Sequence, residues 1–144
     1  QDLNADQVLF CPNGDVQETG AANFILFDGN EVITKALDES FLHGITRNSI
    51  LTLARDRGMD VQERELSVEE LLERAAKPGC EAALSGTAAV LTSVGTLIYR
   101  GQEYQVGSGQ PGKTTRDLRK ALNDIQWGLA DDPHGWVTTI PANA

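Results

Sequence analysis

Two short apolar runs separated by a turn of small residues constrain the fold of this chain more than any other feature. The runs cover residues 81–84 and 88–94, and Ser85, Gly86 and Thr87 lie between them. This pattern predicts two strands joined by a turn. Gly86 tolerates a positive φ, and Thr87 adds a hydroxyl donor. Consecutive free N–H groups in such a turn can bind a carboxylate or a phosphate, although most turns of this kind only connect strands.

The first third of the sequence predicts further strands, arranged as a β-meander. Residues 7–11 and 16–18 flank the pair Asn13-Gly14, which favours a tight hairpin turn. Residues 22–27 and 31–34 flank a second turn at 28–30. Later strands are predicted at 59–66, and at 96–100 and 103–106 as a second hairpin. The chain is therefore expected to contain many short strands.

Three helices are predicted from apolar residues at helical spacing. The first has Thr46 as its N-cap, and the second follows Ser67, which forms a capping box with Glu70. The third begins after Thr114 or Thr115. Residues 130–144 show no periodicity and are expected to be irregular. Together the strands and helices predict one domain over residues 1–144, of the α/β or mixed α+β class.

Composition excludes several classes of function. The net charge of −9 argues against a nucleic-acid backbone or an anionic membrane surface as partner. No apolar run approaches the roughly 20 residues of a membrane-spanning helix. Neither Cys11 and Cys80 nor His43 and His134 have metal-ligand spacing, so no metal site is expected. The two cysteines indicate free thiols that act as small buried hydrophobes in a reducing compartment, and no signal-peptide pattern is visible, so a cytoplasmic location is expected.

Two further segments have the chemistry to bind a ligand. Glu18 ends a predicted strand, where its carboxylate either faces solvent or meets a cationic group of a ligand. The segment Gly44-Ile45-Thr46-Arg47 starts a predicted helix, and the N–H groups and dipole of a helix start suit a phosphate, although every helix has such an end. The glycine-rich residues 107–112 match neither nucleotide-binding glycine motif, so they are expected to form an ordinary loop.

Taken together, three segments resemble one enzyme family. The order and spacing of these segments resemble those of fold-type IV pyridoxal-phosphate enzymes, above all the branched-chain amino acid aminotransferases. The segments are Glu-Thr-Gly-Ala-Ala-Asn-Phe at 18–24, Gly-Ile-Thr-Arg-Asn-Ser at 44–49 and Ser-Gly-Thr-Ala-Ala at 85–89. Gly-Gln-Pro-Gly at 109–112 and His-Gly-Trp at 134–136 resemble the same family. The similarity covers about residues 6–136. It implies the large domain of that fold, with mixed sheets, a pseudo-barrel and about three helices.

The resemblance implies a role for five residues. Glu18 matches the glutamate that pairs with the pyridine nitrogen of pyridoxal 5′-phosphate. Ile45 and Thr46 match the pair whose backbone N–H groups hold the cofactor phosphate. Thr87 matches a threonine whose hydroxyl also binds that phosphate. Thr87 and Ala88 match the turn whose N–H groups receive the α-carboxylate of the substrate. The turn at residues 85–88 is thus expected to bind two anions.

The resemblance also implies groups that this chain does not supply. None of Lys35, Lys77, Lys113 and Lys120 lies in the family's lysine motif. The Schiff-base lysine and a small N-terminal domain are therefore expected upstream of residue 1, and no catalytic residue is expected within the chain. The chain alone is expected to be inactive.

The complete protein implied by the resemblance is a homodimer that transfers amino groups between leucine, isoleucine or valine and 2-oxoglutarate. Two alternatives stay open. One is a non-catalytic truncated domain, or a domain that depends on a second chain for the lysine. The other keeps the fold but changes the reaction, because D-amino acid aminotransferases and aminodeoxychorismate lyases share this architecture.

Overall fold

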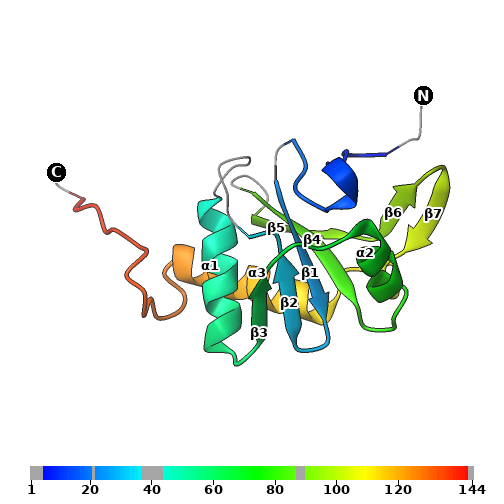
Figure 1. Cartoon of the computed structure of the whole chain (residues 1–144). Helices are drawn as coiled ribbons and strands as arrows, with labels where there is room; N and C mark the ends of the chain where they lie inside the picture. Colours follow the sequence, from blue (N-terminus) through cyan, green and yellow to red (C-terminus); the bar gives the residue numbers. More distant parts are fainter. Residues whose placement is uncertain (1–4, 21, 37–43, 87–89, 143–144) are drawn as a thin grey trace.

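A five-stranded sheet forms the centre of the computed structural model, which describes residues 5–20, 22–36, 44–86 and 90–142 (Figure 1). The strand order is β3-β2-β1-β4-β5, and β6 and β7 form a separate two-stranded hairpin. In chain order, the elements are the short 3₁₀ turn η1 (Pro12–Gly14), β1 (Asn23–Asp28), β2 (Glu31–Thr34), α1 (Ile45–Asp56), β3 (Asp60–Glu63), α2 (Val68–Ala75), β4 (Glu81–Gly86), β5 (Val90–Val94), β6 (Thr96–Tyr99), β7 (Gln102–Gln105) and α3 (Lys113–Gln126). The mixed α+β class and the three predicted helices are confirmed.

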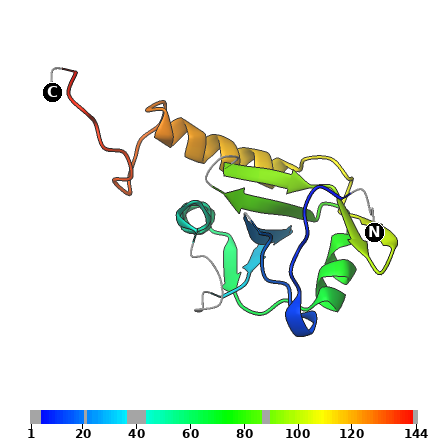
Figure 2. The same ribbon diagram turned by 90° about the horizontal axis from the view of Figure 1, so that it is seen from above.

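Both faces of the sheet are buried, because the side chains of β1 alternate between two apolar cores. Ile25 and Phe27 pack with α1 and α3, whereas Phe24 and Leu26 pack with α2 and Val106. Figure 2 shows α1 and α2 on opposite sides of the sheet. A run of apolar residues such as 24–27 is what a strand covered on both faces requires.

The strand register brings the ends of several strands together at one end of the sheet, which we call the site edge. In the antiparallel pair of β1 and β4, Asn23 at the start of β1 lies opposite Ser85 near the end of β4. Thr34 ends β2 opposite Ile25 of β1, and Glu63 ends the parallel neighbour β3 opposite Thr34. Helix α1 begins at the site edge (Figure 1). Residues far apart in the sequence therefore meet where these elements start and stop.

The two predicted strands at 7–11 and 16–18 are wrong. The turn between them does form, with positive φ at Asn13 and Gly14. The two arms are joined by an isolated bridge between Leu9 and Thr19 and by two backbone hydrogen bonds of Phe10, to Gln17 and Glu18, but neither arm forms a regular strand. The backbone N–H of Val16 instead donates to the carbonyl of Leu66 at 2.7 Å. The second arm of the turn is thus drawn toward the start of α2, so the ladder of a regular hairpin does not develop.

Two predicted helix caps are also wrong, and one is confirmed. Ser67 caps α2 by accepting a hydrogen bond from the N–H of Glu70 at 3.1 Å. Helix α1 starts at Ile45 with Gly44 as N-cap, so Thr46 lies inside the helix. Helix α3 has Gly112 as N-cap, and its first N–H groups bind the carboxylate of Glu81 from β4. A distant carboxylate replaces the local threonine, which no sequence-local rule can predict.

The segment after α3 forms neither helix nor strand through residue 142, as predicted, and it extends away from the body of the molecule (Figure 2). His134 ties this segment to the body of the molecule, because its Nε2 lies 2.6 Å from a carboxylate oxygen of Asp56 at the end of α1. The ring of His134 also stacks on Trp136. Among the helices in the described part of the chain, none has the length and apolar character needed to cross a bilayer.

Both cysteines are free thiols, as the sequence indicated. Cys80 is 3% exposed within the core beneath α2, and burial raises the pKa of its thiol to about 11. Cys11 is partly buried against the same core, and burial raises the pKa of its thiol as well. A raised pKa disfavours the reactive thiolate, so both side chains act as small hydrophobic groups.

Candidate functional site

Asn23 links the segments that the sequence singled out. It forms an isolated antiparallel bridge with Glu18 and lies opposite Ser85 in the sheet. A Cβ placed on Gly44 would lie only 2.3 Å from Oδ1 of Asn23, so the start of α1 packs directly against this side chain. Three segments that lie far apart in the sequence therefore converge on one buried asparagine, which is 5% exposed.

The start of α1 presents backbone donors rather than side chains. Helix geometry leaves the N–H groups of Ile45, Thr46 and Arg47 without an acceptor inside the helix. The N-cap Gly44 has no side chain that could cap them. The Ile45 side chain is 85% exposed and Thr46 is partly buried, so Ile45 can contribute to a site only through its backbone. With the positive end of the helix dipole, these donors suit a phosphate group.

The end of β4 lies beside this helix start. Ser85 is 1% exposed, and its Oγ has no hydrogen-bond partner among the described residues. Its side chain is on the same face of the sheet as Ala83 and Leu91, which belong to the core under α1 and α3. Thr87 and Ala88 lie outside the described residues, directly after Gly86.

Glu18 is partly buried on the other side of Asn23. Its backbone carbonyl accepts a hydrogen bond from the N–H of Phe10 at 2.8 Å, which joins this segment to the arm that precedes η1. Glu18 and the start of α1 thus both adjoin Asn23, so an acidic residue and the N–H donors of a helix belong to one region. Such a site can accommodate a ligand with a cationic end and an anionic end.

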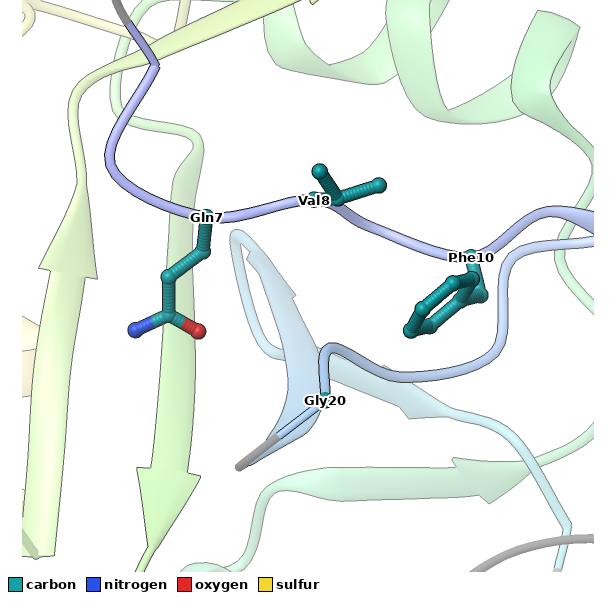
Figure 3. Close-up of a pocket in the computed structure, with 4 residues that line it drawn as sticks. All are labelled: Gln7, Val8, Phe10 and Gly20. Carbon is teal, nitrogen blue, oxygen red and sulfur yellow. The ribbon is translucent and has the colours of Figure 1, made fainter.

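A broad hollow lies next to the Glu18 segment. Its described lining consists of Gln7, Val8, Phe10 and Gly20, and its volume is about 460 Å³. Figure 3 shows the Gln7 and Phe10 side chains directed toward the segment that carries Gly20, whereas Val8 points the other way. Val8 is 67% and Phe10 51% exposed, so the hollow is open and apolar. The described lining includes none of the predicted site residues.

Arg47 also belongs to this region, although its sequence context predicted no role for its side chain. It is 1% exposed and is the largest fully buried side chain among the described residues. Its guanidinium donates to the backbone carbonyl of Lys35 and to Oε1 of Glu63, each at 2.8 Å, and to Asn48 at 3.0 Å. The hydrogen bond from Arg47 is the main reason why the pKa of Glu63 is below its usual value, and Arg55 adds to the effect.

A signal for the burial of Arg47 does exist in the sequence. Arg47, Ile50, Leu51 and Ala54 follow the spacing i, i+3, i+4, i+7, which is the apolar face of α1. An arginine at the first position of that face must be buried along with its neighbours. This position therefore indicates a charged side chain with partners inside the fold.

Comparison with known proteins identifies relatives along most of the chain. A sequence profile of the amino-transferase class IV family matches residues 1–96. A protein of Streptomyces coelicolor named "Probable branched-chain-amino-acid aminotransferase" is 42% identical over 127 residues, which is 87% of this chain and 35% of that protein. "Branched-chain-amino-acid aminotransferase 2" of Bacillus subtilis is 35% identical over 129 residues, again 35% of that protein. The chain thus spans about a third of the length of these curated relatives.

Solved structures similar to this chain also include branched-chain amino acid aminotransferases. The branched-chain amino acid aminotransferase from Escherichia coli superimposes with a TM-score of 0.77 at 31% identity, over 90% of this chain and 41% of that one. The branched-chain amino acid aminotransferase from Thermobaculum terrenum in its PLP-form gives a TM-score of 0.73 at 30% identity, over 87% of this chain and 38% of that one. The expected fold is therefore confirmed, and the profile match over two thirds of the sequence shows that the chain belongs to the class IV amino-transferase family.

Proposed function

We propose that this chain is the cofactor-binding large domain of a pyridoxal-phosphate-dependent branched-chain amino acid aminotransferase. The complete protein transfers the amino group between leucine, isoleucine or valine and 2-oxoglutarate in the cytoplasm, and acts as a homodimer. Relatives and solved neighbours with branched-chain aminotransferase names support this assignment, and one of those neighbours was solved in its PLP-form. The observation that carries the proposal is the convergence of Glu18, the start of α1 and the end of β4 on Asn23.

The donors and acceptors at the site edge match the two ends of the cofactor. The N–H groups of Ile45 and Thr46 bind the phosphate at the start of α1, and the hydroxyl of Thr87 adds a third donor. Glu18 holds a proton at the ring nitrogen, because a carboxylate favours a cationic partner. The chemistry supplied by the bound cofactor is that of an electron-accepting pyridinium ring. Thr87 and Ala88 orient the substrate by binding its α-carboxylate through their N–H groups.

The lysine that the reaction requires lies, in this proposal, outside residues 1–144. Each of the four lysines in the chain pairs with a carboxylate: Lys35 with Glu65, Lys77 with Asp28, Lys113 with Asp117 and Lys120 with Asp124. None of the four matches the lysine motif of the family. Residues 1–144 alone should therefore show no transamination between leucine and 2-oxoglutarate.

Glu18→Gln in the complete protein tests this function. The amide is nearly the same size but cannot hold a proton at the ring nitrogen, so we expect kcat for leucine and 2-oxoglutarate to fall by on the order of 10²-fold. Glu103→Gln is the matched control, because Glu103 is exposed on β7. Near-normal kcat in Glu18→Gln would refute the role of Glu18. Faster turnover of D-alanine than of L-leucine by the wild type would instead refute the branched-chain assignment.

A further inference from the structure

We propose that Arg47 is a positioning residue for the phosphate end of the site: its buried guanidinium fixes the first turn of α1, and with it the direction of the phosphate-binding N–H groups. The inference rests on the proposed function. It goes beyond that function because Arg47 itself is not assigned to the cofactor or the substrate. It acts through the backbone of Ile45 and Thr46, which precede it in the same turn.

The contacts of Arg47 join three elements that meet at the site edge. Nη2 bonds the carbonyl of Lys35, just after β2, and also Oε1 of Glu63 at the end of β3, each at 2.8 Å. Nη1 bonds Oδ1 of Asn48 in the next position of α1 at 3.0 Å. A planar guanidinium can hold several acceptors in one fixed arrangement, which neither an apolar side chain nor a lysine can reproduce. The first turn of α1 is thereby fixed relative to β2 and β3.

The other side of the helix start is fixed by close packing. Gly44 lies against Asn23, where even a methyl group would overlap the Asn23 amide. The first turn is therefore held by Asn23 on β1 and by Arg47 through β2 and β3. Hydrogen bonds to an anion weaken steeply when the donors turn away, so a helix start held at two points keeps its N–H groups aimed.

Stability alone does not account for a charged side chain at this position. Burial of a charge is costly even when it is paired, and a well-packed apolar residue of similar volume often serves stability equally well. Nε of Arg47 adds to this cost, because it is buried without a partner in the described part of the chain. Glu63 would keep a partner without Arg47, since its second oxygen accepts from Arg55 at 3.0 Å and its side chain is 35% exposed. Loss of Arg47 therefore leaves no carboxylate stranded.

The experiment measures how much the phosphate contributes to cofactor binding in the complete protein. Dissociation constants of the cofactor-free protein are determined for pyridoxal 5′-phosphate and for pyridoxal, which lacks the phosphate, and inorganic phosphate is used as a competitor. The variants are Arg47→Met and Arg47→Lys, the second of which keeps the charge. Arg55→Met is the matched control, because Arg55 shares the carboxylate of Glu63 but lies two turns further along α1, half-exposed. Thermal unfolding of each variant reports whether it is folded.

Because the helix start donates two hydrogen bonds to a charged phosphate, the wild type and Arg55→Met should bind pyridoxal 5′-phosphate about 100-fold more tightly than pyridoxal. Arg47→Met should lower this preference by about tenfold with little change in the affinity for pyridoxal, and Arg47→Lys should give an intermediate value. The intermediate value of Arg47→Lys decides the question if Arg47→Met does not fold. The inference is overturned if the Arg47 variants keep the preference of Arg55→Met. A wild type without any phosphate preference overturns the proposed function itself, and the inference with it.

Discussion

Gly44→Ala places a methyl group where the start of α1 meets the sheet. The backbone of Gly44 has φ −69° and ψ 125°, which alanine adopts readily, so any effect must come from contact. The added Cβ would lie 2.3 Å from Oδ1 of Asn23, whereas real Cβ contacts essentially never fall below 3.0 Å. Asn23 is 5% exposed and cannot simply swing into solvent. Overpacking of this kind costs about 1–3 kcal/mol, and we expect that loss in the free energy of unfolding.

A double-mutant cycle measured by urea denaturation isolates the contact. In an Asn23→Ala background the obstructing amide is absent, so Gly44→Ala should cost less than about 0.5 kcal/mol there, which corresponds to a coupling energy of about 0.5–3 kcal/mol. Gly20→Ala is the control, because its Cβ meets nothing within 4 Å, and it should leave stability within about 0.5 kcal/mol. Because the methyl group also moves the phosphate-binding turn, Gly44→Ala in the complete protein should weaken binding of pyridoxal 5′-phosphate by about tenfold. Additive effects of the two substitutions would show that Gly44 and Asn23 are not in contact.

Two further predictions concern stability. Glu81→Ala removes the carboxylate that accepts hydrogen bonds from the N–H groups of Thr114 at 3.0 Å and Thr115 at 2.8 Å. The free energy of unfolding, measured by urea denaturation, should therefore fall by about 2–3 kcal/mol. Equal stability of Glu81→Ala and wild type would refute this capping role. The second prediction concerns unfolding in acid. A hydrogen bond from Arg74 is the main cause of the lowered pKa of Glu31, and one from Arg64 is the main cause of the lowered pKa of Glu70. A carboxylate whose pKa is lower in the folded state stabilises the fold above its unfolded pKa of about 4.3, and this stability is lost as the pH falls below that value. The urea midpoint should therefore fall between about pH 5 and pH 3, less steeply in Arg74→Met, and parallel profiles of the two proteins would contradict the assignment.

Local sequence rules predicted the elements whose causes are local. The apolar run in β1, the turn to β2, the Ser67 cap of α2 and the hairpin of β6 and β7 all follow from neighbouring residues, and all are present. The failures have distant causes. The N-terminal strands did not form because Val16 pairs with Leu66, some fifty residues later. The cap of α3 comes from Glu81, some thirty residues earlier.

The geometry of the candidate site could likewise be predicted only in part. Spacing and resemblance brought Glu18 and the start of α1 together as candidates, and the structure places both beside Asn23. Arg47 escaped notice because its partners, Glu63 and the carbonyl of Lys35, become neighbours only when β2 and β3 align in parallel. The burial of an arginine can be predicted from helical spacing, but its partners depend on sheet register.

The most direct test of the central claim is a crystal structure of the complete protein grown with pyridoxal 5′-phosphate. We expect the phosphate within hydrogen-bond distance of the backbone N–H groups of Ile45 and Thr46, with the ring nitrogen facing the carboxylate of Glu18. A phosphate bound away from the start of α1, or a ring nitrogen paired with another residue, would contradict it.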